Sequence, residues 1–226
     1  GIPKYFYFPG FQEEVGGLLL DPIPLAGELT SQNIPEDLKT VWSKLRPNAK
    51  RVSVFCYPGA PLKKWLEDLG TLDEKFDILL THGHAELLEL SLGKPISLPE
   101  NLQLLSIPFV SQDEYDWVLS QCDFNIVRGE DSFIRAQLAG KPFIWHIYPQ
   151  EDRAHEVKLA AFLDLYLENV SQELRLAIIA AMTWAMPSTW FNSFDAWNSH
   201  ALAWRSHLLE KQHEGGLAAR LMRFVG

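Results

Sequence analysis

The sequence predicts an α/β fold, namely a Rossmann-like parallel sheet followed by a segment made entirely of helices. Short apolar segments with strand character alternate with amphipathic segments as far as residue 150. Such strand–helix–strand units form right-handed crossovers between parallel strands. Beyond residue 150 the apolar residues have helical spacing only. We therefore expect a Rossmann-like domain at residues 1–150 and a helical segment at residues 151–226 that packs on it.

Six segments have the composition of β-strands. Each is a short run rich in aliphatic, β-branched or aromatic residues, and most are bounded by Gly, Pro or charged residues. They are Lys4–Phe8, Arg51–Tyr57, Asp77–Thr81, Leu102–Ile107, Phe124–Val127 and Pro142–Ile147.

Helices are predicted between these strands and throughout the last third of the chain. Ser111 and Glu114 have the spacing of a capping box, which marks the start of one helix clearly. Gly140 followed by Pro142 marks the end of another. The predicted helices are Ile34–Leu45, Pro61–Leu69, Ala85–Leu90, Ser111–Cys122, Glu130–Ala139, Arg153–Tyr166, Ser171–Trp184, Pro187–Trp204 with an extension to Gln212, and Leu217–Phe224.

The composition excludes some classes of function. Hydrophobic content of 47% and charged content of 22% are ordinary for a globular domain. A net charge of −9 argues against a nucleic-acid-binding protein. No apolar run approaches the roughly 20 residues of a membrane span, so we expect no membrane partner. Cys56 and Cys122 lie in or next to apolar runs, which predicts buried free thiols and a reducing, cytoplasmic compartment.

The most informative stretch is Phe124–Ile147. It predicts a strand, a tight turn at Arg128–Gly129, and a helix that opens with Gly-Glu-Asp-Ser. The first-turn N–H groups of a helix have no intrahelical partner, and the helix dipole favours an anion beside them. Arg128 adds a side chain that can bond to phosphate.

The ends of the other strands add candidate ligand groups, because open α/β sheets bind ligands outside the carboxyl ends of their strands. Together they supply aromatic rings for a base and hydroxyl and N–H groups for phosphates, which indicates a nucleotide-diphosphate site. There is no GxGxxG and no GxxxxGK[ST] motif, so neither a dinucleotide nor a P-loop site is indicated. The residues selected are Tyr57–Gly59, Thr81–His84, Pro108–Phe109, Arg128–Ser132 and Tyr148–Gln150.

Structural roles remain open for the same residues. Asp131 or Ser132 would serve as an ordinary helix cap, with Glu130 favouring the dipole. That interpretation explains the acids but not Arg128, and the two interpretations are about equally supported by residue type. Lone aromatic residues such as Tyr57 and Phe109 are commonly core residues, and Gln112 is ordinarily a solvated residue of a first helical turn.

Residues 107–158 resemble the EarP family of bacterial protein-arginine rhamnosyltransferases, which modify an arginine of translation elongation factor P. RGEDS at 128–132 and AGKPFIWHIYPQED at 139–152 carry the resemblance. Phe8–Phe11, Gly16–Leu19, Val52–Tyr57 and the Trp-rich C-terminal helices agree with it, so the resemblance extends over essentially the whole chain.

The resemblance implies a GT-B glycosyltransferase, in which two Rossmann-like domains face each other across a cleft. Such an enzyme would transfer L-rhamnose from dTDP-β-L-rhamnose to an arginine side chain of elongation factor P, with inversion and with no metal or other cofactor. The implied donor site has a thymidine side, formed by Phe55, Tyr57, Phe109 and Gln112. Around the diphosphate and sugar it has Arg128, Glu130, Asp131 and Ser132. Glu130 and Asp131 are the implied catalytic residues of this half.

The chain departs from the family in one respect. Nothing matches the DNFGDIG-like motif that carries the acceptor-activating aspartates. We therefore expect the chain to be the C-terminal, donor-binding half of the enzyme, which binds donor but transfers almost no sugar alone. The helix at Leu217–Phe224 would then lack the domain against which it packs.

Two other functions are compatible with the residues. One is a non-catalytic module that binds a nucleotide or another protein. The other is a GT-B sugar-nucleotide epimerase, in which His82 and His84 would serve as the acid and base.

Overall fold

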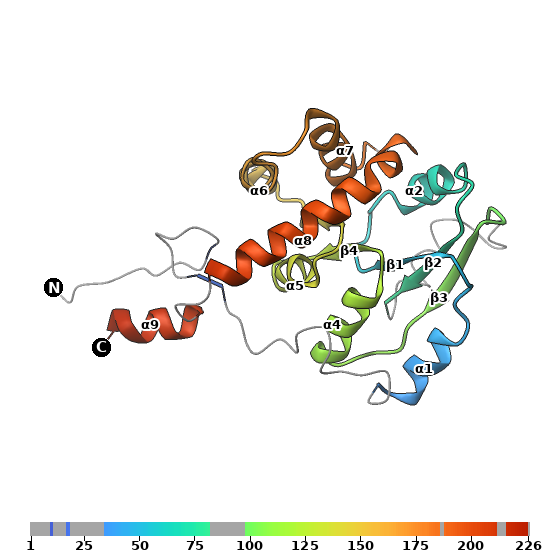
Figure 1. The fold of residues 1–226 in the computed structure, drawn as a ribbon, viewed down its shortest axis with the longest axis horizontal. Coiled ribbons are helices and arrows are strands. Elements are labelled where there is room, and N and C mark those ends of the chain that lie inside the picture. Colours follow the sequence, from blue (N-terminus) through green and yellow to red (C-terminus); the bar gives the residue numbers. More distant parts are fainter. Residues whose placement is uncertain are drawn as a thin grey trace.

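A parallel five-stranded sheet forms the centre of the molecule in the computed structural model (Figure 1). The structure describes residues 10, 17–18, 34–81, 98–185, 188–211 and 216–225. The strands lie in the order β3-β2-β1-β4-β5, which confirms the predicted α/β class. Their bounds are β1 Lys50–Val54, β2 Phe76–Leu80, β3 Leu102–Ser106, β4 Phe124–Arg128 and β5 Phe143–His146. The predicted strand at Lys4–Phe8 lies outside the described residues.

Helices follow the strands as the sequence predicts. Ser111 caps α4 with the expected capping box, and Gly140 ends α5 in the left-handed conformation with φ 67°. The predicted helix at Ala85–Leu90 lies outside the described residues. The helices are α1 Glu36–Trp42, α2 Leu62–Leu69, α4 Gln112–Gln121, α5 Asp131–Ala139, α6 Ala154–Tyr166, α7 Gln172–Met182, α8 Phe194–Lys211 and α9 Leu217–Val225, with a 3₁₀ helix η1 at Ser188–Ser193.

One predicted helix is interrupted. The segment expected to be continuous from Pro187 to Trp204 is instead η1 followed by α8. Phe191 at the interruption stacks on Phe194, with ring centroids 5.3 Å apart, and meets the ring of Phe76 from β2 at 5.5 Å. Packing against the sheet therefore overrides the local helical pattern at this point.

The order of the strands places a topological switch point at the centre of the sheet. β1 pairs with β2 on one side, with Val52 opposite Ile78, and with β4 on the other, with Val52 opposite Phe124. The chain continues outward from β2 to β3 and, later, from β4 to β5. Ligands of doubly wound sheets bind at the carboxyl ends of the two strands where the order reverses. These ends are Val54 in β1 and Arg128 in β4.

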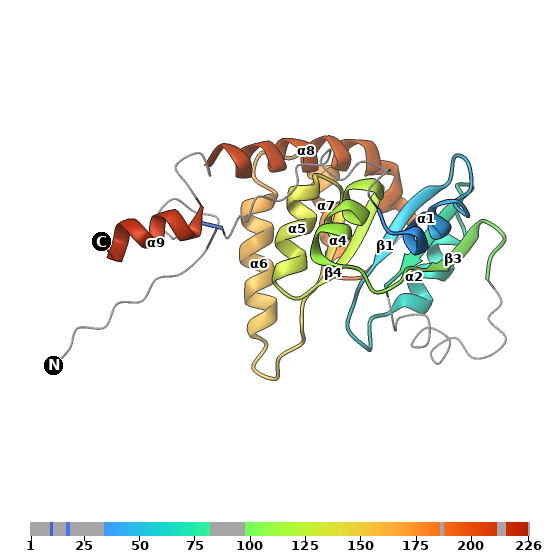
Figure 2. The same cartoon turned by 90° about the horizontal axis from the view of Figure 1, so that it is seen from below.

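Helices cover both faces of the sheet (Figures 1 and 2). On one face, Leu38 of α1 and Val118 of α4 are buried in a cluster with Leu79. The larger cluster includes residues of α2, α5, α6, α7 and α8. Trp197 and Trp204 of α8 are buried and belong to this larger cluster.

Both cysteines are buried free thiols, as predicted. Burial raises the pKa of the Cys56 thiol to about 12. None of the described helices is both long enough and apolar enough to cross a membrane.

Helix α9 buries none of its residues. Met222, Phe224 and Val225 expose at least half of their surface, and in both views the helix lies away from the sheet (Figures 1 and 2). Its first residue donates a backbone hydrogen bond to the carbonyl of Leu18 at 2.8 Å. That α9 packs against another domain stays a prediction.

A buried ion pair ties the start of the sheet together. Arg46, in the loop before β1, donates from Nε to Oδ1 of Asp77 at 2.7 Å and from its backbone N–H to Oδ2 at 2.7 Å. Its Nη2 also donates to the carbonyls of Phe76 and Asn101. Asp77 is fully buried, so no water replaces these bonds if the arginine is removed.

We expect Arg46→Ala to lower the free energy of unfolding by about 3 kcal/mol, because it leaves the Asp77 carboxylate buried without its cationic partner. Urea denaturation of the purified chain measures this change. Lys39→Ala is the matched control, since Lys39 pairs with Glu36 on the surface of α1, and it should change stability little. Equal free energies of unfolding for Arg46→Ala and Lys39→Ala would contradict the claim that the Arg46–Asp77 pair stabilises the fold.

Candidate functional site

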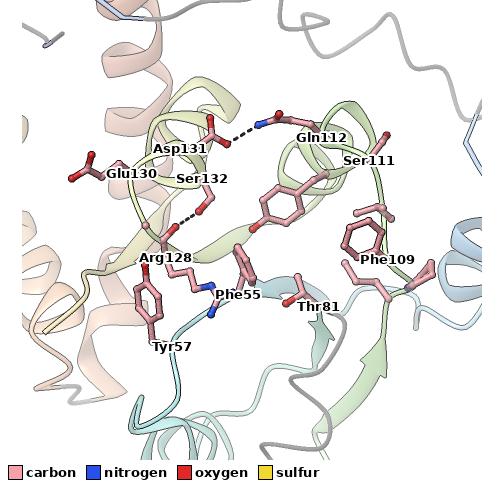
Figure 3. A pocket seen from close by; sticks show the side chains of 15 residues that line it. Phe55, Tyr57, Thr81, Phe109, Ser111, Gln112, Arg128, Glu130, Asp131 and Ser132 are labelled. Atoms are coloured by element: carbon pink, nitrogen blue, oxygen red, sulfur yellow. Dashed lines mark hydrogen bonds between the residues drawn. The ribbon is translucent and has the colours of Figure 1, made fainter. Parts of the chain in front are cut away.

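A pocket of about 610 Å³ opens at the carboxyl ends of β1, β2 and β4 (Figure 3). It lies at the switch point of the sheet, between the segments that lead into α4 and α5. Its lining combines aromatic, aliphatic, hydroxyl, carboxylate and guanidinium groups. The lining residues are Phe55, Tyr57, Thr81, Ile107, Pro108, Phe109, Val110, Ser111, Gln112, Tyr115, Arg128, Gly129, Glu130, Asp131 and Ser132.

The structure brings together the eight residues that the resemblance implies for the donor site, whereas Pro58, Gly59 and Tyr148–Gln150, which the strand-end rule also selected, do not line the pocket. Phe55, Tyr57, Phe109, Gln112, Arg128, Glu130, Asp131 and Ser132 all line this one pocket. Their contact with a ligand stays a prediction. One of the structural alternatives is wrong, because Phe109 is 87% exposed and is therefore not a core residue. His82 and His84 lie outside the described residues.

Arg128 is held by aromatic rings at the end of β4. Its Cζ lies 4.2 Å from the ring centroid of Phe55 and 4.9 Å from that of Tyr57. Its Nη1 donates to the carbonyl of Cys56 at 3.5 Å. None of the ion pairs within the described ranges involves Arg128. The guanidinium is thus oriented by two cation–π contacts and keeps its positive charge for an anion in the pocket.

The left-handed turn after Arg128 favours glycine. Gly129 has φ 67°, and a Cβ at this position would lie 3.5 Å from the hydroxyl of Tyr57. Its carbonyl accepts a hydrogen bond from Nε1 of Trp145 at 2.8 Å. This turn brings the first residues of α5 beside Arg128 at the pocket wall.

The alternative in which Asp131 or Ser132 caps α5 is wrong. Glu130 occupies the cap position and makes no side-chain cap bond. The Asp131 carboxylate accepts from the side chain of Gln112 instead, and the Ser132 hydroxyl donates to the carbonyl of Arg128. Because no cap side chain bonds to the first turn of α5, its N–H groups remain suited to an anionic ligand.

Two acidic residues at the start of α5 line the pocket, and Figure 3 shows Asp131 directed toward Gln112 and Glu130 directed away from the other lining side chains. Oδ2 of Asp131 accepts from Nε2 of Gln112 at 2.6 Å and from Nε of Arg135 at 2.9 Å. Glu130 pairs with Lys158 at 3.2 Å, and both of these side chains are more than half exposed. Carboxylates accept hydrogen bonds and repel phosphate, so they suit the hydroxyl groups of a sugar.

His146 supports the floor of the pocket in its neutral form. The backbone N–H of Tyr57 donates to its Nδ1 at 3.0 Å, and the two rings lie 5.7 Å apart. Burial and then the nearby charge of Arg128 lower the pKa of His146. A neutral ring is required here, since a protonated Nδ1 does not accept the Tyr57 bond.

Tyr115 is a pocket residue that the sequence interpretation missed. It lines the pocket and meets the Phe55 ring, with the ring centroids 5.9 Å apart. Its hydroxyl is buried without a hydrogen-bond partner among the described residues, and burial raises its pKa. Tyr115 follows Gln112 by three residues, so both side chains lie on one face of α4. This spacing could have identified Tyr115 as a pocket residue from the sequence.

The whole chain, residues 1–226, matches the sequence model of a family described as Elongation-Factor P (EF-P) rhamnosyltransferase EarP. The chain belongs to the EarP family. Relatives in this family include the protein-arginine rhamnosyltransferase of Pseudomonas putida, 37% identical over 90% of the chain and 56% of the relative. That of Shewanella oneidensis is 35% identical over 100% of the chain and 63% of the relative. The chain therefore spans less than two thirds of the length of these curated relatives.

Solved structures agree with membership in the EarP family. One, described as the structural basis for EarP-mediated arginine glycosylation of translation elongation factor EF-P, matches with a TM-score of 0.79 and 31% identity. That match covers 97% of this chain and 75% of the solved chain. MurG of Acinetobacter baumannii matches with a TM-score of 0.50 and 15% identity, over 82% of this chain and 52% of that chain, and shows the fold alone. The fold is thus that of a GT-B glycosyltransferase domain.

The neutral state of His146 predicts a pH dependence of stability in this EarP-family chain. A histidine whose folded pKa is lowered binds protons more readily in the unfolded state. Its contribution to stability is therefore present above the ordinary His pKa of about 6.5 and is lost as the pH falls through and below it. His146→Gln retains an acceptor for Tyr57 without a titrating group, so the free energy of unfolding should fall less between about pH 7.5 and about pH 5.5.

Urea denaturation at the two pH values measures this difference. Because Asp116 and His200 titrate in both proteins, their contributions cancel in the comparison. His207→Gln is the control, since His207 is exposed on α8, and it should retain the original pH profile. The same profile in His146→Gln and the original chain would contradict the assigned neutral state.

Proposed function

We propose that the chain is the donor-binding domain of a protein-arginine rhamnosyltransferase. In the whole enzyme, L-rhamnose would pass from dTDP-β-L-rhamnose to an arginine side chain of translation elongation factor P, with inversion at the anomeric carbon. Membership in the EarP family and the names of the relatives support the reaction. The observation that carries the donor assignment is the Arg128 guanidinium, held on two aromatic rings beside the N-terminus of α5 in one pocket.

The nucleoside is assigned to the side of the pocket near α4. Phe109 offers an exposed ring on which a thymine base can stack, and Gln112 offers an amide that can bond to its edge. Phe55 and Tyr57 contact the guanidinium of Arg128 in the structure. We assign these two rings to the position where the nucleoside is linked to the diphosphate, and there they also orient Arg128.

The diphosphate is assigned to Arg128 and the first turn of α5. An arginine fork forms charge-assisted bonds to phosphate oxygens, and the helix N-terminus adds N–H donors and a favourable dipole. The aromatic rings hold Arg128 and the helix fixes its own N–H groups, so little reorganisation is needed when negative charge grows on the leaving dTDP.

The sugar is assigned to the mouth of the pocket, beside Glu130 and Asp131. Their carboxylates can accept hydrogen bonds from rhamnose hydroxyls and can stabilise positive charge in an oxocarbenium-like transition state. The acceptor nitrogen forms a bond to the anomeric carbon as the bond from that carbon to the dTDP oxygen breaks. The guanidinium then loses one proton. Its free pKa exceeds about 12, so a carboxylate that orients it matters more than simple deprotonation.

The groups that orient the acceptor arginine are assigned to a part of the enzyme outside this chain, whereas Glu130 and Asp131 serve the donor side. The proposal uses no metal ion or other cofactor, because Arg128 and α5 supply the charge stabilisation. We place the reaction in the cytoplasm, where reduced cysteines such as Cys56 and Cys122 are the norm.

Isothermal titration calorimetry of the chain tests the donor assignment directly. We expect both dTDP and dTDP-β-L-rhamnose to bind with a stoichiometry of about one, since one pocket offers the phosphate donors. We expect almost no transfer to elongation factor P by the chain alone. Circular dichroism verifies the fold, and a folded protein that binds neither compound would overturn the proposal. Turnover of the sugar nucleotide by the chain alone would favour an epimerase instead.

Arg128→Ala should weaken dTDP binding by roughly 10- to 100-fold, the value of charge-assisted hydrogen bonds to phosphate. Arg128→Lys should bind with intermediate affinity, because it keeps the charge but loses the planar fork and the stacking on Phe55 and Tyr57. Arg175→Gln is the matched control, since Arg175 of α7 donates to the carbonyl of Leu167 at the end of α6, and neither residue lines the pocket. Unchanged dTDP affinity in Arg128→Ala would rule out the assigned phosphate contact.

A further inference from the structure

The carboxylate of Asp131 is bonded to Arg135, which is itself bonded to Asp116, and neither Arg135 nor Asp116 lines the pocket. Arg135 follows Asp131 by one turn of α5 and donates from Nε to its Oδ2 at 2.9 Å. The same guanidinium donates from Nη1 to Asp116 of α4. The side chains of Arg135 and Asp116 are only 13% and 8% exposed. We propose, on the basis of the donor function above, that Arg135 and Asp116 are positioning residues that orient Asp131 toward the sugar of the donor.

Four side chains form this arrangement across the two helices. Gln112 and Asp116 are separated by one turn of α4, and Asp131 and Arg135 are separated by one turn of α5. Both donors to Asp131 bond to the same atom, Oδ2. Oδ1 accepts no hydrogen bond from the described side chains and is therefore the oxygen available to a sugar hydroxyl. Two donors from two different helices fix the rotamer of a side chain that is otherwise 69% exposed.

The energetics of Asp116 favour a functional role over a purely stabilising one. Burial outweighs the attraction of Arg135 and raises the pKa of Asp116 to about 6. The neighbouring charges of Asp113 and Asp131 act in the same direction. Its Oδ1 is buried without a hydrogen-bond partner among the described residues. Burial thus opposes the ionised form of the carboxyl that pairs with Arg135. The ionised Asp116 carboxylate therefore lowers the stability of the folded state, while it keeps the Arg135 guanidinium beside Asp131.

The proposal separates two ligands that differ only in the sugar. At its diphosphate end dTDP offers only phosphate oxygens, which are acceptors and give Asp131 nothing to bind, and its own donors, the thymine N3–H and the 3′-hydroxyl, lie at the nucleoside end. In contrast, dTDP-β-L-rhamnose offers hydroxyl donors. Loss of the Arg135 contact should therefore weaken only the binding of the sugar nucleotide. A general loosening of the pocket would weaken the binding of both compounds alike.

Calorimetry with dTDP and dTDP-β-L-rhamnose on two variants of the full chain tests this inference. Arg135→Gln should bind the sugar nucleotide about fivefold more weakly, the value of one ordinary hydrogen bond, and should keep its affinity for dTDP within about twofold. Asp116→Asn should show the same preference. Its thermal midpoint should stay close to that of the original chain, because the Asn side chain keeps an oxygen acceptor for Nη1 of Arg135 and Asp131 still pairs with the same guanidinium. Arg175→Gln, which alters an arginine away from the pocket, should change neither affinity.

Each outcome decides between the alternatives. Suppose that the original chain binds both compounds. The positioning role is then overturned, and the donor function stands, if the two variants bind both compounds equally more weakly or bind both with unchanged affinity. If the original chain binds neither compound, the donor function fails and the inference fails with it. If Arg135→Gln does not fold, Asp116→Asn decides the question by the same comparison.

Discussion

The contact of the Arg128 guanidinium with the rings of Phe55 and Tyr57 is the interaction on which the rest of the site depends. An arginine side chain has many rotamers, and a free one at the edge of a sheet would lose entropy on binding phosphate. The two rings remove much of that cost before a ligand arrives. The rings also leave the positive charge of Arg128 unneutralised, whereas a carboxylate partner would neutralise it. A fixed cation that pairs with no carboxylate in the described part of the chain, beside a helix N-terminus, is a strong arrangement for a diphosphate.

The sheet makes this contact possible. β1 and β4 are neighbours only because the strand order reverses between them, and this pairing brings Phe55 and Arg128 to the same edge. His146 at the end of β5 then holds the backbone of Tyr57. The glycine at position 129 lets the chain turn into α5 close to the Tyr57 hydroxyl. The buried Arg46–Asp77 pair fixes the opposite end of the sheet, so the strands that carry the site have a defined register.

The sequence predicted the parts of this arrangement that depend on local chemistry. The capping box at Ser111 and the left-handed Gly140 follow from short-range rules, and the strand-end rule selected much of the pocket. The EarP resemblance added Phe55 and Gln112. Contacts between distant segments were not predictable, because no local pattern specifies which helices pack together. The bridge from Asp116 through Arg135 to Asp131 and the break at Phe191 both belong to this group.

In the proposed function, Arg128 and the first turn of α5 bind the diphosphate of the donor. A crystal structure of the chain with dTDP-β-L-rhamnose tests it most directly. We expect phosphate oxygens about 3 Å from the Arg128 guanidinium and from backbone N–H groups at the start of α5, with the sugar beside Asp131. A donor bound elsewhere on the molecule, or bound in this pocket with no phosphate contact to Arg128, would contradict it.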